Sequence, residues 1–268
     1  MSFYSENDRS NVLERVSEWL EKQESVFAVI LVGSGAKGFR DRFSDIDLTV
    51  VLEVNADVDG FLAEYQEYLN GEFAVMINHR VWGRPLAVAV LDNLLEIDIS
   101  AVFLHELRAV RESWKVLSDR SGQAESVMQR TWNERTSADM SERVDSGFNG
   151  AAWGFWHYLI YAALAVKRGD LWRACWEIQC VRDMIVELTG LESGLETKRY
   201  RDVKKFSDET LARLEKTFPA GFTQHEFARA LKETAELIYD ILEERFGDTL
   251  EFPRDKMTEY FAVTIEDL

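Results

Sequence analysis

The stretch that decides the fold runs from Val26 to Leu52 and reads VFAVILVGSGAKGFRDRFSDIDLTVVL. Its apolar beginning, as far as Val32, predicts a buried strand. The glycines of Gly33-Ser34-Gly35 allow backbone angles that other residues avoid, and they let a ligand approach closely. Residues 36–40 are expected to form a short helix whose first amides attract an anion. The pattern therefore predicts a strand followed by a turn suited to phosphate.

Two carboxylates follow this turn in alternation. Asp45 and Asp47 are separated by Ile46, and in a strand alternate side chains share one face. Asp45 and Asp47 should therefore project together beside the turn, while Ile46 points into the core. Neighbouring carboxylates repel each other unless a cation lies between them, and oxygen ligands suit Mg²⁺. A phosphate turn beside a Mg²⁺ site indicates a site that handles nucleotides.

These residues carry a resemblance to a known family. The pattern Gly33-Ser34-x-Ala36-Lys37-Gly38 followed by Ser44-Asp45-x-Asp47-Leu48 resembles the signature of the nucleotidyltransferase superfamily, which includes polymerase beta. The length of the chain and its helical second half are most similar to the aminoglycoside and lincosamide antibiotic adenylyltransferases. The family requires a third carboxylate on a later strand, and Asp98 lies on a segment that alternates as a strand does.

The resemblance implies a role for each matching residue. Asp45 and Asp47 would bind two Mg²⁺ ions, and Asp98 would bind the ion that activates the acceptor hydroxyl. Backbone amides at Gly33 and the hydroxyl of Ser34 would hold the β- and γ-phosphates. Three further residues are assigned to nucleotide binding: Lys37, Arg42 and Ser44. Lys37 fills a family position that is often Arg, and Arg40 also lies close by, so any of these cations could neutralise phosphate charge.

Glu96 shares the predicted strand face of Asp98. It is a candidate catalytic general base, since a carboxylate can take a proton that lies within hydrogen-bond reach. It is equally a candidate anchor for a basic group of the substrate, or a partner for an arginine. The sequence favours none of these.

The predicted fold class is α+β. A mixed-sheet nucleotidyltransferase domain is expected over residues 1–130, a linker over 131–146, and a helical domain that closes on substrate and nucleotide over 147–268. Helices are expected over residues 8–23, 58–70, from 118–119 to about 130, 148–167 and 171–188, with further helices after residue 207. Strands are expected over residues 26–32, 45–52, 73–77, 85–91, 94–99 and 114–117.

The helical half carries two further hypotheses. Lys167-Arg168-Gly169-Asp170 resembles a helix ending of lincosamide-type enzymes, in which a lysine contacts the triphosphate; basic residues at a helix end also simply stabilise its dipole. Aromatic side chains could stack on adenine or on a substrate ring, although an aromatic stripe more often belongs to a core. The candidates are Trp153, Trp156, Tyr158 and Tyr161.

The composition restricts the partners. The net charge of −17 argues against nucleic acid and suits a cationic small substrate, although acidic proteins are also common for reasons of solubility. No membrane-spanning stretch and no signal peptide are recognised, so a cytoplasmic location is expected. No membrane partner is expected, and the protein is expected to be a monomer or a homodimer.

The resulting hypothesis is a Mg²⁺-dependent enzyme that moves AMP from ATP to a hydroxyl of a small molecule and releases pyrophosphate. The acceptor is predicted to be an aminoglycoside-like antibiotic, so that the enzyme would confer antibiotic resistance. The alternatives are a lincosamide acceptor, a protein acceptor, and a non-catalytic nucleotide-binding module.

Overall fold

The computed structural model describes residues 3–137 and 139–268. The chain forms two compact units, Met1–Thr136 and Ser137–Leu268, and each has its own hydrophobic core. None of the helices in the described ranges combines the length and the apolar character that crossing a bilayer requires. The predicted α+β class is confirmed, because strands occur in the first unit and helices make up the second.

The first unit is built on a six-stranded mixed sheet with the order β3-β4-β5-β2-β1-β6. The central pair, β2 with β5, is parallel, and the other four pairings are antiparallel. The strands are β1 (Val26–Val32), β2 (Ile46–Leu52), β3 (Val75–Arg80), β4 (Leu86–Leu91), β5 (Glu96–Phe103) and β6 (Lys115–Asp119). All six expected strands are present, with ends that differ by a few residues.

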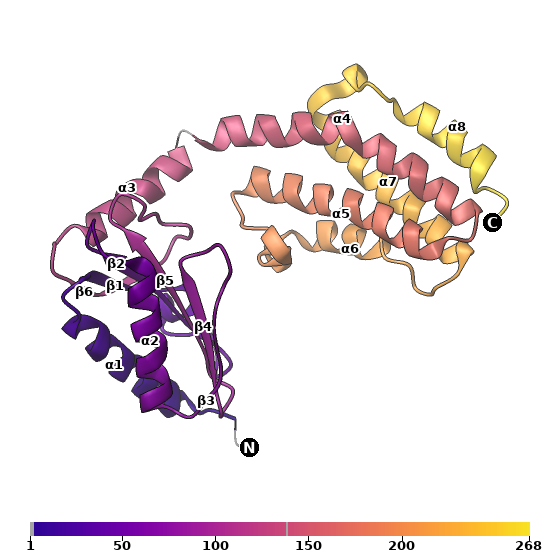
Figure 1. Ribbon diagram of the computed structural model, residues 1–268. Coiled ribbons are helices and arrows are strands. Elements are labelled where there is room, and N and C mark those ends of the chain that lie inside the picture. The colour runs from indigo at the N-terminus through magenta and orange to yellow at the C-terminus, as the bar shows by residue number, and fades with distance from the viewer. Residues whose placement is uncertain (1–2, 138) are drawn as a thin grey trace. The chain divides into compact units, whose positions relative to one another are not determined.

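Two helices cover one face of this sheet, α1 (Glu6–Lys22) and α2 (Val58–Glu72), as Figure 1 shows. Their apolar faces pack on the inward residues of the central strands, among them Ile46, Leu48, Ile97 and Ile99, which are almost fully buried. The strand residues between these point to the other face. The site described below therefore lies on the face opposite α1 and α2.

The other face is covered only in part by helix α3 (Ala124–Ser137). Its residues Val127 and Met128 pack with Ala28, Ile30 and Val51 of β1 and β2. Because Val51 lies at the carboxyl end of β2, this second core leaves the amino-terminal end of β2, where the aspartates lie, outside it.

The turn after β1 differs from the expectation. Residues 33–37 form one turn of 3-10 helix, Gly33–Lys37, which ends at Gly38 in the left-handed conformation. The prediction of a helix over residues 36–40 is therefore wrong. The observed helix begins at Gly33 and includes the Gly-Ser turn, whereas the predicted one began after it. With glycines at 33, 35 and 38, a longer helix would be weakened by backbone entropy.

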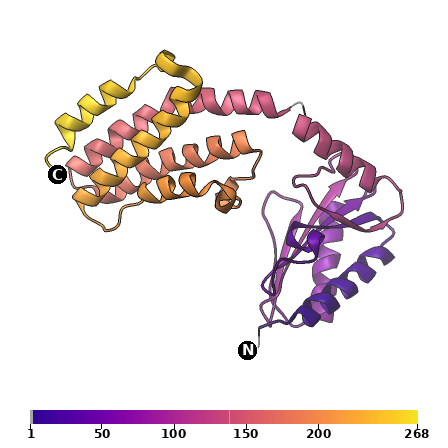
Figure 2. The same ribbon diagram turned by 180° about the vertical axis from the view of Figure 1, so that it is seen from behind.

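The second unit is a bundle of five α-helices within the described residues (Figure 2). The long helices pack against one another, α4 with α5 and both with α7, around a core that includes Phe155 and Tyr239, whose ring centroids lie 4.9 Å apart. The helices are α4 (Asp139–Lys167), α5 (Leu171–Ser193), α6 (Asp208–Lys216), α7 (Gln224–Phe246) and α8 (Arg254–Thr264).

Residues 131–146, which we expected to form a linker, are helical on either side of residue 138. Helix α3 continues to Ser137, and α4 begins at Asp139, well before the predicted start at residue 148. Polar residues without an apolar period can still form a helix when their intrinsic helix propensity is adequate. The absence of an apolar stripe in residues 131–146 therefore did not indicate where these two helices end and begin.

Candidate active site

Two aspartates face each other across the parallel strand pair. Asp47 of β2 and Asp98 of β5 are register partners, and both side chains point away from the core under α1 and α2. Adjacent strands lie about 4.8 Å apart, which keeps both carboxylates at one place on the sheet. Asp45 comes immediately before β2, and its charge contributes to the raised pKa values of both aspartates, so the three predicted carboxylates lie at the same end of the two strands.

Two residues further along each strand, a pair of hydroxyl side chains lies on the same face as these aspartates. Thr49 and Ser100 are also register partners, and their hydroxyl oxygens lie 3.2 Å apart. The Ser100 hydroxyl also lies 3.3 Å from the carbonyl oxygen of Leu48, to which it donates. These two contacts connect β2 and β5 two residues beyond Asp47 and Asp98.

The Gly-Ser turn lies directly against Asp47. Val32, the last residue of β1, is the register partner of Asp47, so Gly33 follows beside it. A Cβ atom built on Gly33 would come 2.1 Å from Oδ2 of Asp47, and the φ angle of Gly33 is +65°. Only glycine satisfies both conditions, because other residues rarely adopt this angle and their Cβ would displace the carboxylate.

Burial and the charges of neighbouring carboxylates raise the pKa values of two of these aspartates. Burial raises the pKa of Asp98 to about 7, and the nearby charges of Glu96, Asp47 and Asp45 contribute further. Burial likewise raises the pKa of Asp47 to about 6, with the charge of Asp45 adding to the effect. A carboxylate cluster with raised pKa values binds a proton or a cation more tightly than isolated carboxylates do.

Two buried polar atoms at the site have no hydrogen-bond partner: Oδ1 of Asp98 and Oγ of Ser34. Buried polar atoms in folded proteins are almost always satisfied by protein, water or a ligand. One atom is an acceptor suited to a cation, and the other can donate to a phosphate oxygen. Both are therefore suited to the groups that the resemblance assigns to them.

Within residues 3–137 and 139–268, no three His, Cys, Asp or Glu side chains are close enough together to form a preassembled metal site. Carboxylates of like charge repel each other, which favours conformations in which they turn apart. The donor set nevertheless fits Mg²⁺, because it consists of oxygen ligands, one of which is the buried and unsatisfied Oδ1 of Asp98.

Glu96 is exposed at the start of β5 and shares the face of Asp98. Its charge raises the pKa of both Asp98 and Asp47, so it belongs to the same acidic cluster. Its assignment as general base or as anchor stays a prediction at this point.

Arg111 is a member of the site that sequence reasoning missed. It lies in the loop between β5 and β6, and its charge lowers the pKa of Asp47, against the effect of burial and of Asp45. The following residue, Glu112, forms an ion pair with Lys37 of the 3-10 helix. This ion pair connects the loop to the Gly-Ser turn. No pattern in the sequence relates this loop to the Asp-x-Asp strand.

Replacing Arg111 by Gln is expected to raise the pKa of Asp47, because the positive charge that opposes burial is removed. Carboxyl-carbon NMR titration of the Mg²⁺-free protein measures this value directly. The pKa of Asp119, on the edge strand β6, serves as the control and should not move. An unchanged Asp47 titration would show that Arg111 does not act on the site.

The other residues predicted to bind nucleotide have partners within the protein. Lys37 pairs with Glu112, and the guanidinium of Arg42 lies 4.6 Å from the ring centroid of Phe43. Ser44 is buried, and its carbonyl oxygen accepts hydrogen bonds from Tyr4 and Arg9. The contacts of Ser44 position the start of β2. The nucleotide roles of these three residues stay predictions.

Lys167 belongs to the second unit, at the end of α4. Its ammonium nitrogen lies 2.7 Å from Oδ1 of Asp267, so a phosphate would have to compete with this ion pair. Beyond it, Asp170 accepts a hydrogen bond from the backbone of Arg173 and caps α5. The contact of Lys167 with triphosphate stays a prediction.

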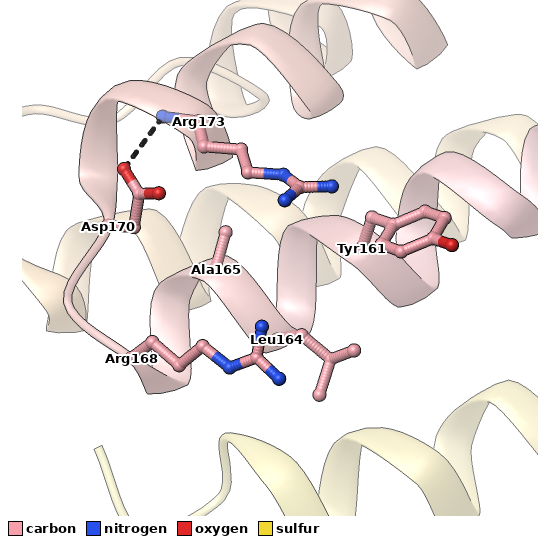
Figure 3. A pocket seen from close by; sticks show the side chains of 6 residues that line it. All are labelled: Tyr161, Leu164, Ala165, Arg168, Asp170 and Arg173. Atoms are coloured by element: carbon pink, nitrogen blue, oxygen red, sulfur yellow. Dashed lines mark hydrogen bonds between the residues drawn. The ribbon is translucent and has the colours of Figure 1, made fainter.

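A small pocket lies at this junction of α4 and α5, and Figure 3 shows the side chains that line it. The guanidinium of Arg173 packs over the ring of Tyr161 at 5.2 Å and also pairs with the buried Glu177 at 3.2 Å. The lining residues are Tyr161, Leu164, Ala165, Arg168, Asp170 and Arg173.

The aromatic candidates of α4 divide between core and surface. Trp153 and Tyr161 are exposed, whereas Trp156 and Tyr158 are half-buried and pack against the core of the second unit. Trp156 stacks on Phe252 with ring centroids 5.6 Å apart. Packing therefore accounts for Trp156 and Tyr158, while stacking on a ligand stays a prediction for the other two.

Comparison with known proteins identifies the class. Residues 13–100 match the family model described as a nucleotidyltransferase domain, and this segment contains the turn, Asp45, Asp47 and Asp98. The chain thus carries a nucleotidyltransferase domain, which confirms both the resemblance and the prediction of a nucleotidyltransferase enzyme. No curated protein matched the chain.

The solved structures that align with this chain include two whose alignments extend over nearly all of it. An aminoglycoside 6-adenyltransferase from Bacillus subtilis is 13% identical, with a TM-score of 0.42, and the alignment covers 98% of this chain and 99% of that one. A nucleotidyltransferase-like protein from Exiguobacterium sibiricum 255-15 is 13% identical, with a TM-score of 0.44, and the alignment covers 97% of this chain and 89% of that one.

Proposed function

We propose that this protein transfers AMP from ATP to a hydroxyl group of a small molecule and releases pyrophosphate. The observation that carries the proposal is the pairing of Asp47 with Asp98 across two parallel strands, with a buried and unsatisfied oxygen on Asp98 and the Gly-Ser turn beside it. The matched nucleotidyltransferase domain supports the same reaction class.

The proposed reaction is a single displacement at the α-phosphorus of ATP. The acceptor hydroxyl oxygen forms a bond to the α-phosphorus, the bond from that phosphorus to the bridging oxygen of pyrophosphate breaks, and the hydroxyl proton passes to a carboxylate of the site. Asp45, Asp47 and Asp98 would hold two Mg²⁺ ions. When bound, Mg²⁺ supplies positive charge that stabilises the attacking and leaving oxygens.

The chain's own residues would orient the nucleotide. The amides around Gly33 and the unpartnered hydroxyl of Ser34 are candidate donors to the β- and γ-phosphates. Arg111 adds positive charge beside Asp47, and Lys37 becomes available to phosphate if its ion pair with Glu112 opens. This arrangement would place the α-phosphorus beside the carboxylates.

The acceptor is proposed to be a cationic, aminoglycoside-like antibiotic. The support is the net charge of −17 and the acidic cluster at the site, because an acidic surface concentrates cationic molecules. A small-molecule acceptor of this kind would make the protein a resistance enzyme acting in the cytoplasm.

A labelling experiment tests the transfer. With Mg²⁺ and an aminoglycoside panel, label from [α-³²P]ATP is expected to move to one or more acceptors, whereas label from [γ-³²P]ATP should appear only in pyrophosphate. Omitting Mg²⁺ should abolish both signals. A lincosamide and a lysate protein fraction are included as other acceptors. The absence of transfer to any acceptor in the presence of Mg²⁺ would contradict the proposed function.

A further inference from the structure

The sheet face beside the carboxylates continues onto the hairpin of β3 and β4. Val88 of β4 is the register partner of Asp98, and Val90 is the register partner of Glu96. On β3, Ile77 is paired with Val90. Register partners of adjacent strands share a face, so these apolar side chains lie beside the acidic ones.

This part of the face is not filled by either core of the described first unit. Ala87, Ala89 and Leu91 of β4 point into the core under α1 and α2, whereas Val88 and Val90 belong to neither core and are half-buried. Ile77 is 48% exposed. We call the set Ile77, Val88, Val90 and Glu96 the hairpin face.

The dimensions of the hairpin face match a small molecule. Strand spacing places Val90 about 5 Å and Ile77 about 10 Å from Glu96 along one row across the sheet. In the neighbouring row across the sheet, Val88 is paired with Asp98, and these two residues are also about 5 Å apart. A ligand of one or two six-membered rings would therefore cover the apolar residues while one end lies at the carboxylates.

The charge of the hairpin face selects the kind of ligand. Glu96 is exposed, and it is not among the three carboxylates assigned to Mg²⁺, so its negative charge stays available when Mg²⁺ is present. An exposed carboxylate beside β-branched apolar side chains suits a molecule with a saturated ring face and an ammonium group. A planar phosphate-bearing nucleotide would be repelled by Glu96.

We propose that the hairpin face binds the acceptor, with a saturated ring packed on Ile77 and Val90 and an ammonium group on Glu96. This inference rests on the proposed function, because it puts the acceptor hydroxyl beside Asp98. It assigns Glu96 as the anchor of a basic substrate group, one of the roles that the sequence left open.

The test is equilibrium binding without ATP or Mg²⁺, measured by calorimetry with kanamycin as the probe. Its fully N-acetylated derivative keeps the rings and hydroxyls but has no charge, and is expected to bind about tenfold more weakly or worse. Glu96→Gln should weaken kanamycin binding by about tenfold and leave the acetylated form unchanged. Ile77→Ser should weaken both by about three- to tenfold, because apolar contact area is lost.

Matched controls are available in the same unit. Glu64→Gln removes an exposed charge from α2, which covers the opposite face of the sheet. Val54→Ser alters a side chain that is 67% exposed beyond the carboxyl end of β2, at the far end from the carboxylates. Neither control should change the affinity for kanamycin. Unfolding temperatures of all four variants should stay near that of the unmodified protein, because each site is exposed.

Two results would overturn the inference: no binding of kanamycin by the unmodified protein, or equal affinities for the unmodified protein, Glu96→Gln and Ile77→Ser. Neither result decides the proposed function, which fails only if the radiolabel experiment with Mg²⁺ shows no transfer to any acceptor. The two failures are distinguishable because the binding experiment contains no nucleotide and no metal.

Discussion

Asp98→Asn is expected to lower nucleotidyl transfer about a thousandfold or more and, at the same time, to raise the unfolding temperature of the Mg²⁺-free protein at pH 8. The loss of activity follows from removing one of the three carboxylates proposed to hold Mg²⁺, which supplies several kcal/mol to such transfers. The gain in stability follows from the raised pKa of Asp98, which means that the folded state disfavours its charge.

The pH dependence of this gain has a definite sign. The pKa of Asp98 is about 7 in the folded protein and 3.8 without its environment, so the folded state is penalised once the carboxylate ionises. The advantage of Asn is absent below about pH 4, grows between pH 4 and 7, and is complete above pH 7. Because the side chain is partly exposed, solvent screening reduces the advantage to about 1–2 kcal/mol, or a few degrees.

Asp119→Asn provides a control of opposite sign on the same sheet. Burial alone would raise the pKa of Asp119, but hydrogen bonds from Ser121, Ala124 and Gly122 outweigh burial and lower it. The substitution should therefore destabilise the protein at pH 8. Thermal unfolding at pH 4.5 and 8 measures both variants. If Asp98→Asn is no more stable than the unmodified protein at pH 8, the electrostatic description of the site is wrong.

Gly33→Ala is the second substitution with a large expected effect. Its Cβ would lie 2.1 Å from Oδ2 of Asp47, so the carboxylate has to move, and the φ angle of +65° adds backbone strain of about 1–2 kcal/mol. A displacement of about 1 Å in a catalytic group costs roughly a hundredfold in rate. We therefore expect transfer to fall about a hundredfold and the unfolding temperature to drop.

Gly38→Ala distinguishes the effect of backbone strain from the effect of a steric clash with Asp47. Gly38 also has a positive φ angle, +96°, but a Cβ there would meet nothing within 4 Å. It should lose a similar amount of stability while its transfer rate stays within a few fold of the unmodified protein. Steady-state rates and thermal unfolding of both variants make the comparison. Equal losses of rate in the two variants would show that contact with Asp47 is not what requires glycine at position 33.

Much of the first unit could be predicted from sequence because its signals are local. The apolar run of β1 and the alternation in β2 and β5 determine both strand identity and the face of each side chain, and the structure pairs Asp47 with Asp98 on one face of the sheet. The family model confirms the class that this pattern indicated.

The features that the sequence did not predict depend on tertiary contacts or on local hydrogen bonds, and not on the periodicity of apolar residues. Arg111 acts on Asp47 because a loop after β5 folds beside the Gly-Ser turn, and no spacing in the sequence encodes that approach. The helical start of α4 at Asp139 was missed because polar helices lack an apolar stripe. The 3-10 helix was missed because a run of glycines suggests a turn without specifying its hydrogen bonds.

The residues that keep the chemistry aligned lie on the side of the sheet where no chemistry is proposed. If β5 slid along β2 by one position, Ile97 or Ile99 would stand opposite Asp47, and Asp98 would be forced towards α1 and α2. The burial of those two isoleucines in the hydrophobic core under α1 and α2 opposes such a shift of register. A screen for loss of activity should therefore also find substitutions in the core under α1 and α2. Such variants would keep all the acidic residues but have an altered register between β2 and β5.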